Sequence, residues 1–442
     1  LSVEDYRTRH SFYKLDASLQ AAHQQHPFIN IWDDHETAND SYKDGASNHD
    51  PATEGDWETR KSNGKQAFFE WLPIRDNVNQ QIYRSFSYGN LVDLIMLDTR
   101  LEGRMQQVET ISDPAFTSED RTILGETQKE WFLDELSNSD AQWKLIGNQV
   151  IFSPIVYEPL LALSSLAEQI IVDIWEGYPA ERNTVVNHII DNNIGNIAFL
   201  TGDVHVTFAF DVSATPGDTT LYDPNTGQGS IAVEMVTPSI SSDGYDEVLG
   251  GTFADILQNL LTQNNPQLKK ANVFDHGYYL LDVTPDKLQA DWYYMQTITE
   301  FDISDDNAYF GNGLYTLNGE NWLRPTEEPA APKTEQPELA PGSIVGITDP
   351  SQPNTNSLLI LGSYPNPAHN YTVLNYGLDQ QAPINISLFD STGKKVAQLF
   401  DGKQNPGLYS ISYNTEQLAN GMYYIQLSTN KYKTSTKLVV QH

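Results

Sequence analysis

The sequence has no cysteine, and this absence excludes several kinds of chemistry. Disulfides, thiolate metal ligands and cysteine nucleophiles all require a thiol. Cationic side chains are scarce as well, because 26 Lys and Arg face 59 Asp and Glu, which gives a net charge of −33. A field of this sign repels phosphate backbones and anionic membranes at long range. No local basic patch offsets it, so we expect no nucleic-acid-binding surface.

Long apolar runs are also missing. The most apolar stretch, residues 155–175, is interrupted by Glu158, Glu168 and Asp173, and we therefore expect no transmembrane segment. The patterns G-x-x-x-x-G-K-S/T, G-x-G-x-x-G and G-x-S-x-G, which mark nucleotide loops and serine hydrolases, do not occur either. The residues that are present include 39% hydrophobic and 11% aromatic side chains, enough for a sizeable core. With thiol sites, nucleotide-binding loops and serine hydrolases excluded, the kind of active site that remains is one built around metal ions.

Proline is concentrated in one part of the chain. Seven prolines lie between residues 324 and 356, mixed with Glu, Thr and Ser, and this composition is typical of an extended spacer. The sequence therefore predicts three parts: a large domain over residues 1–323, a Pro-rich linker over 324–356 and a small domain over 357–442. The small domain holds six Lys and four acids, so the negative charge belongs to the large one.

The small domain consists of short alternating runs separated by turn residues. Period-2 alternation of apolar and polar residues predicts a small antiparallel β-sandwich without a catalytic cluster. The expected strands cover 372–378, 384–400 with a turn at Ser391-Thr392-Gly393, 407–413, 421–428 and 434–440.

The large domain alternates between strand-like and helix-like runs, which predicts an α/β core, mixed or layered. A hairpin over 276–295 would add antiparallel strands. The expected strands are 27–32, 91–98, 142–152, 196–203 and 230–237, and the expected helices include 18–26, 126–137 and 180–193.

The densest polar cluster follows the first expected strand. Carboxylates, amides and one imidazole occur together in residues 33–40, where they would repel one another without a cation. Oxygen and imidazole donors suit Ca, Mg, Mn, Fe or Zn. The alternative is a solvated helix cap with Asp33 or Asp34 as the N-cap. The cluster is Asp33, Asp34, His35, Glu36, Asn39 and Asp40.

Two further groups follow other expected strands. Asp203 and His205 are two residues apart, so in an extended conformation both face one side and reach one ion, or they form a structural pair. Arg100 offers a fork for phosphate or carboxylate, or it neutralises Asp33 or Asp34. Weaker candidates, each more commonly structural, are Asn148, Gln149 and His276.

Several separated motifs together resemble the PhoD-type alkaline phosphatases of the metallophosphatase kind, over residues 1–295. The resemblance implies a layered αββα fold, a secreted phosphomonoesterase or phosphodiesterase acting on small phosphate esters, and a site with iron and calcium. The motifs are IWDDHETAND (31–40), LIMLDTR (94–100), DIWEGYPAER (173–182), LTGDVH (200–205) and VTPSISS (236–242).

The resemblance also assigns roles to individual residues. Asp34 stands where the wider family has a metal-binding Asn, and Asp203 stands where it has the first His of a G-H-x-H loop. His35 would contact the phosphoryl group or protonate the leaving oxygen, and Arg100 would orient substrate or hold a ligand carboxylate. Together with the polar clusters described above, this leads us to expect Asp34, Asn39, Asp203 and His205 as metal ligands, and His35 and Arg100 as catalytic residues.

One expected part of the family site does not occur in the sequence. The family carries a G-D-x-x-Y loop that holds iron and a phosphate-binding Arg, and no such loop precedes Asp33. Residues 6–28 resemble the segment that normally follows this loop, so we expect the loop to lie upstream of Leu1. The alternatives are a non-catalytic secreted or cell-surface binding protein on a degenerate phosphatase scaffold, and a hydrolase for a different ester.

The small domain has a resemblance of its own. The segments YPNPAHN (364–370), FDSTGKKV (389–396), LANGMYYIQLST (418–429) and TKLVV (436–440) are similar to the C-terminal sorting domain of type IX secretion. This resemblance implies that residues 357–442 engage the secretion machinery of a Gram-negative bacterium. The protein would then be secreted or attached to the outer cell surface. A carbohydrate-binding module is the alternative, with an aromatic row supplied by Tyr409, Tyr413, Tyr423 and Tyr424.

Overall fold

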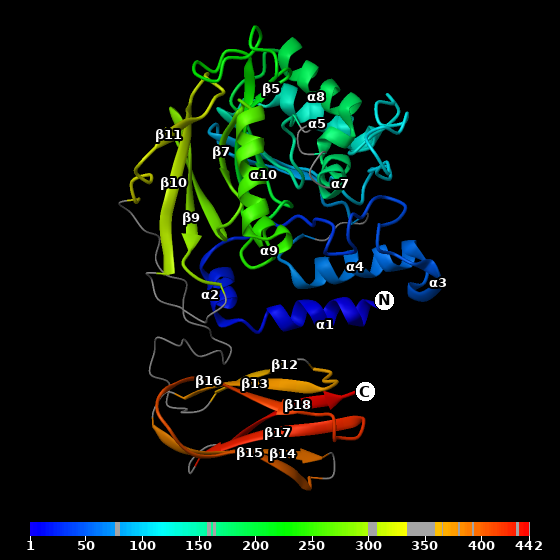
Figure 1. The fold of residues 1–442 in the computed structure, drawn as a ribbon, viewed down its shortest axis with the longest axis vertical. Coiled ribbons are helices and arrows are strands. Elements are labelled where there is room, and N and C mark those ends of the chain that lie inside the picture. Colours follow the sequence, from blue (N-terminus) through cyan, green and yellow to red (C-terminus); the bar gives the residue numbers. More distant parts are fainter. Residues whose placement is uncertain are drawn as a thin grey trace. The chain divides into compact units, whose positions relative to one another are not determined.

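The computed structural model divides the chain into two units, Leu1–His10 with Ile29–Thr334 and Ser11–Phe28 with Glu335–His442 (Figure 1). Each unit is described by itself. The residues that the structure describes are 1–75, 80–156, 161, 165–298, 307–333, 359–364, 366–378, 381–390, 393–429 and 433–441.

A seven-stranded sheet forms the centre of the first unit, with the strand order β1-β2-β3-β4-β6-β5-β7. Four neighbouring strands run parallel: β2 (Val92–Met96), β3 (Trp143–Gly147), β4 (Ile197–Thr201) and β6 (Ser230–Val236). Their carboxyl ends therefore meet at one edge of the sheet, where ligands bind in open α/β folds. β1 (Arg84–Tyr88) pairs antiparallel with β2, and β5 (Thr207–Ser213) pairs antiparallel with both β6 and β7 (Leu268–Asn272).

Helices cover one face of this sheet. Apolar side chains of α5, α8 and α10 join Ile95, Ile146 and Phe199 in one buried core. Pro179 occupies the first turn of α8, where its missing N–H costs no helical hydrogen bond. The helices of this unit other than α1 are α3 (Pro51–Glu54), α4 (Trp57–Trp71), α5 (Glu126–Asn138), α7 (Ser165–Asp173), η1 (Trp175–Gly177), α8 (Pro179–Asp191), α9 (Tyr245–Leu249) and α10 (Gly251–Asn264).

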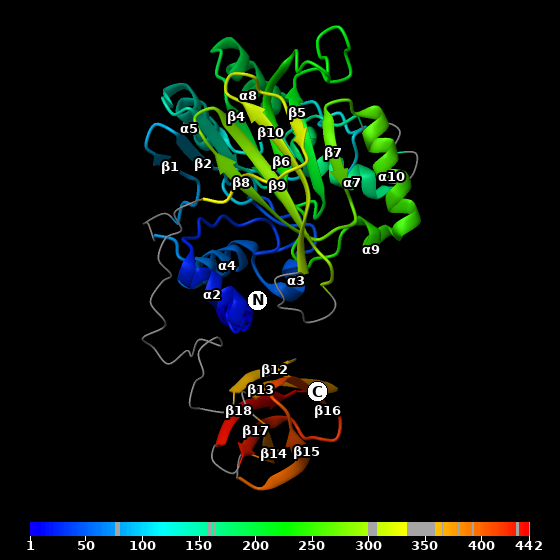
Figure 2. The ribbon, with the colours of Figure 1, turned by 90° about the vertical axis from the view of Figure 1, so that its left-hand side faces the viewer.

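A second, four-stranded sheet packs against the other face, and Figure 2 shows its strands in front of β4 and β6. Leu288 and Trp292 from this sheet share a core with Leu145 and Val233 from the large one. The first unit is therefore layered as helices, large sheet and small sheet. The strands of the small sheet are β8 (Gly277–Val283), β9 (Lys287–Met295), β10 (Ala308–Leu317) and β11 (Arg324–Thr326).

These observations confirm the predicted α/β core, the predicted hairpin and four of the five predicted strands of the large domain. The strand predicted over 27–32 is wrong, because these residues pair with no other strand in the part of the chain that the structure describes. Trp32 is buried in a small core, which explains the apolar pattern. The carbonyl of Asn30 accepts a hydrogen bond from the Arg84 side chain at 2.7 Å instead of from a neighbouring strand. The strands of this unit that we did not expect are β1, β5, β7, β10 and β11.

Two helices lie near the start of the chain. α1 (Val3–Tyr13) begins in the first unit and ends in the second, and α2 (Ala17–Gln25) belongs to the second unit. Asp16 is the N-cap of α2, and its carboxylate accepts a hydrogen bond from the Leu19 N–H at 2.7 Å. None of the helices that the structure describes is both long and apolar enough to cross a membrane.

The second unit contains the predicted sandwich. A three-stranded sheet, β12-β13-β16, and a four-stranded sheet, β15-β14-β17-β18, enclose one apolar core. Of the predicted turn, Ser391 and Thr392 lie outside the described residues. The strands are β12 (Leu359–Tyr364), β13 (Tyr371–Leu378), β14 (Ala382–Asp390), β15 (Lys395–Gln404), β16 (Gly407–Asn414), β17 (Gly421–Thr429) and β18 (Lys433–Val440).

The aromatic row of the carbohydrate-binding alternative does not form. Tyr409 and Tyr413 pack against the sandwich core, and Tyr423 is buried in it. Tyr424, by contrast, is 40% exposed. Cross-strand neighbours on one face of a sheet would be needed for a flat binding platform, and these residues do not share an exposed face.

Phe152 is a test of the core between the large sheet and the helices. Its ring is fully buried and stacks on Phe199 at 4.1 Å, with Trp175 edge-on at 5.1 Å. We expect Phe152→Ala to lower the free energy of unfolding by about 3–5 kcal/mol, because a cavity remains. All eight tryptophans lie at or before position 322, so tryptophan fluorescence during urea unfolding reports on the first unit.

The matched control is Leu221→Ala, because the side chain of Leu221 is 53% exposed. This change removes similar apolar atoms and should alter the free energy of unfolding by less than about 0.5 kcal/mol. Equal effects of the two variants would contradict the described core.

Candidate metal centre

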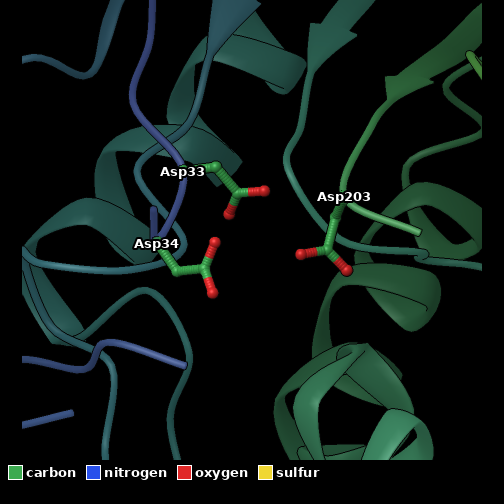
Figure 3. Close-up of side chains that lie close together, drawn as sticks. All are labelled: Asp33, Asp34 and Asp203. Carbon is green, nitrogen blue, oxygen red and sulfur yellow. The ribbon is translucent and has the colours of Figure 1, made fainter. Parts of the chain in front are cut away.

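Three carboxylates from two distant segments meet beyond the carboxyl end of β4. Asp33 and Asp34 come from the loop that precedes α3, and Asp203 lies two residues after β4. One carboxylate oxygen from each lies within 4.8 Å of the others, and Figure 3 shows the three side chains pointing toward one another. The structure therefore brings together the two loops that the sequence singled out.

Asp34 is fixed by its own loop. Its carboxylate accepts hydrogen bonds from the backbone N–H groups of His35 at 2.7 Å and Asp40 at 2.8 Å. Its carbonyl accepts hydrogen bonds from the backbone N–H groups of Thr37 and Ala38. These bonds close one turn, but no helix begins there. The helix-cap alternative is therefore wrong, and the side chain of Asp34 is instead buried with its oxygens directed by the backbone.

The Asp203 turn is not extended, contrary to our expectation. Asp203 has φ 68° and His205 has φ 59°, both in the left-handed region that non-glycine residues rarely adopt. The N–H of Gly202 donates to the carbonyl of Gln149 at 3.0 Å, which ties the turn to the end of β3. Strain of this kind concentrates at functional sites. The two side chains consequently have different neighbours.

Arg100 lies between the two loops and has no exposed surface. Its Nε donates to Asp33 at 2.6 Å, and its Nη2 donates to Asp203 at 2.5 Å. Its Nη1 donates to both oxygens of Asp173 at 2.9 Å. Of the two roles left open for Arg100, these contacts favour holding ligand carboxylates in place.

The negative charge of the cluster exceeds the positive charge beside it. Arg104 also donates to Asp173, at 2.6 Å, and so does Gln107, at 2.7 Å. Five carboxylates thus surround two guanidinium groups, an excess of three negative charges if all are ionised. The five are Asp33, Asp34, Asp40, Asp173 and Asp203.

The pKa values show where this excess lies. Burial raises the pKa of Asp34 and that of Asp203, the charge of Asp33 adds to both increases, and Arg100 only partly offsets them. At Asp173 the two arginines outweigh burial, so its pKa lies below the ordinary value. On the side of the cluster formed by Asp34 and Asp203, the positive charge of Arg100 therefore does not balance the buried carboxylates. Clustered carboxylate oxygens suit hard metal ions, so these residues fit a metal site.

The other predicted site residues lie around this cluster. His35 is exposed, and its Nε2 lies 3.0 Å from the side-chain oxygen of Asn39. His205 is also exposed, and its Nδ1 lies 2.9 Å from the carbonyl of Asp243. Neither imidazole belongs to the acidic group within the described part of the chain. Their roles as ligand or acid, and that of Asn39, stay predictions.

Sequence reasoning missed several residues of this network. Asp173 opens the DIWEGYPAER motif, but nothing in the sequence pairs it with Arg100. Arg104 and Gln107 follow Arg100 closely in the chain. This short spacing is the sequence feature that could have indicated their place in the network. Gln149, a weak candidate, connects two loops, because its side chain accepts from the N–H of Thr99 at 2.9 Å.

Arg100→Met tests the network directly. The change leaves Asp33, Asp173 and Asp203 without their shared cation, and we expect a loss of about 3–5 kcal/mol in the free energy of unfolding in EDTA. The control is Arg7→Met, because Arg7 pairs with Glu70 at the surface and its loss should change stability far less. Equal effects would show that the buried network does not stabilise the fold.

Comparison with known proteins identifies a family for each part of the chain. A family model described as "Secretion system C-terminal sorting domain" matches residues 363–441. This type IX sorting domain directs the chain to the surface or the outside of a Gram-negative cell. A second family model, described as "PhoD-like phosphatase", matches residues 1–292.

Two relatives extend the comparison. Alkaline phosphatase D of Bacillus subtilis (strain 168) is 31% identical over 311 residues, which are 68% of this chain and 49% of that protein. The chain therefore spans about half the length of this curated relative. A solved structure titled "Structure of PhoD" superimposes with a TM-score of 0.62 at 28% identity, over 74% of this chain and 60% of the other. The chain belongs to the PhoD-like phosphatase family.

Proposed function

We propose that the first unit is a secreted, metal-dependent hydrolase of phosphoric esters, an alkaline phosphatase or phosphodiesterase. The observation that carries the proposal is the convergence of Asp33, Asp34 and Asp203 with an excess of negative charge, in a chain of a phosphatase family. In this proposal residues 1–323 are the catalytic domain, 324–356 the linker and 357–442 the sorting domain. Small phosphate esters are the substrates, and the type IX machinery is the partner of the sorting domain.

The proposed metal ligands are Asp34, Asn39, Asp203 and His205, and Asp33 joins them on the evidence of its position. The family resemblance favours calcium and iron. When bound, such ions activate a water molecule and clamp the phosphoryl oxygens during in-line displacement. The donors supplied by the chain are mainly hard oxygens, which supports this choice of ions.

The chain's own residues have separate tasks in this proposal. Arg100 holds Asp33 and Asp203 in position, since its Nε donates to Asp33 and its Nη2 donates to Asp203. His35 lies at the surface of the site, where its ring can contact a phosphoryl group or donate a proton to the leaving oxygen. Oδ2 of Asp34 lies 3.7 Å from the Nε2 of His35.

Metal content is the first test. We expect elemental mass spectrometry to find at least two equivalents of bound metal, and EDTA to lower the melting temperature, because the carboxylates lose their counter-ions. Asp203→Asn should bind metal at least about 10-fold more weakly. The control Asp255→Asn removes the same charge from the exposed face of α10 and should bind as the wild type does. Absence of metal from the wild type would favour the non-catalytic binding protein.

Turnover is the second test, with p-nitrophenyl phosphate and its bis-ester as substrates. The assay uses the complete product of the gene, so that every natural segment is present. We expect Asp34→Asn and Asp203→Asn each to lower kcat at least about 100-fold, because the loss of a ligand is more severe than the loss of a second-shell contact. Asp255→Asn is again the control. Full activity of Asp203→Asn would contradict the role of this residue.

A further inference from the structure

The loop that follows β6 lies against the turn that carries Asp203 and His205. The Nδ1 of His205 is 2.9 Å from the carbonyl oxygen of Asp243. A carbonyl only accepts hydrogen bonds, so Nδ1 carries a proton in this contact, and in the neutral ring Nε2 is the nitrogen that can bind a metal ion. The contact therefore selects one tautomer of His205.

The peptide unit that makes this contact is held from its other side. The carbonyl of Asp243 and the N–H of Gly244 belong to one peptide, and this N–H donates to Oε2 of Glu247 at 2.7 Å. A peptide unit is planar, so fixing the direction of its N–H also fixes the direction of its carbonyl. The carboxylate of Glu247 thus determines where the carbonyl of Asp243 points.

Glu247 is in turn held by His276, which is buried at the start of β8. The Nε2 of His276 lies 2.9 Å from Oε1 of Glu247, and its Nδ1 lies 2.8 Å from the hydroxyl of Ser239. That hydroxyl already donates to the carbonyl of Ser242 at 2.6 Å, so it accepts from His276. Both ring nitrogens of His276 consequently face oxygens that can accept a hydrogen bond, and Nε2 faces the carboxylate of Glu247.

The charge of Glu247 agrees with this arrangement. Burial would raise its pKa, but the hydrogen bonds from His276, Asp246 and Gly244 outweigh burial and lower the pKa to about 2. Glu247 is therefore ionised at neutral pH and can accept from both neighbours. The N–H of Gly277 also donates to the carbonyl of Ser239 at 3.0 Å, which anchors the loop to β8 a second time.

We propose that His276 and Glu247 are positioning residues for His205: they hold the peptide between Asp243 and Gly244 so that Nδ1 of His205 is bound and Nε2 is left to bind a metal ion. Histidine ligands commonly donate their second N–H to a carbonyl, and this contact fixes the ring. The inference rests on the proposed function, because it takes His205 as a ligand. It adds two residues that touch neither metal nor substrate.

Cobalt(II) is the probe for the test. A histidine bound to Co²⁺ through Nε2 gives a strongly shifted, solvent-exchangeable NMR signal from its Nδ1 proton, which is visible only while that proton is protected. We expect this signal in the wild type and its loss in His205→Ala. In Glu247→Gln and His276→Gln the signal should disappear through fast exchange, and the affinity for Co²⁺ by calorimetry should fall about 10- to 100-fold.

Controls separate the possible outcomes. Asp255→Asn removes the same charge from the neighbouring helix α10 and should keep both the signal and the affinity. If the wild type lacks a signal that depends on His205, the ligand role of His205 fails and the inference fails with it. If the wild type has the signal and both variants keep it at unchanged affinity, only the positioning role is overturned. Should His276→Gln not fold, Glu247→Gln decides alone, since Glu247 is 37% exposed.

Discussion

A buried guanidinium surrounded by carboxylates is the interaction on which the site depends. Arg100 has no exposed surface, and it binds Asp33, Asp173 and Asp203, which come from three distant parts of the chain. A buried cation without partners is costly, and so is each of these carboxylates without a cation. The fold can therefore close around Arg100 only when all three segments are in place. Stability and site geometry are coupled at this one side chain.

The same network leaves negative charge uncompensated on one side. Arg104 and Arg100 together balance the charge and the burial of Asp173. The positive charge near Asp34 and Asp203, by contrast, does not balance the burial and mutual repulsion of their carboxylates. Backbone contacts direct the oxygens of Asp34, and a left-handed turn places Asp203 opposite. An arrangement of rigid, repelling donors costs folding energy, and a bound cation would offset this cost. The left-handed backbone at Asp203 and the excess of negative charge thus both favour a site that binds a cation.

Much of the fold could be predicted because its strands and helices are locally encoded. The runs over 91–98 and 196–203 are long enough and apolar enough to become β2 and β4. The run over 27–32 looks similar in sequence, yet Trp32 packs in a small core and Arg84 takes the carbonyl of Asn30. Whether an apolar run pairs as a strand depends on which backbone lies beside it, and a local pattern carries no such information.

By itself the sequence determined the class of each part: an acidic α/β unit without thiol chemistry, a short β-sandwich and two polar loops that each follow an apolar run. Residue types and their periodicity suffice for this, since they decide what can be buried and what can bind an ion. Only the tertiary structure decided that Arg100 lies inside the cluster and binds its carboxylates, and that Asp173 is one of them. It also decided that Glu247 and His276 hold the peptide that His205 contacts. These contacts join residues up to 103 positions apart, and their directions follow from chain closure.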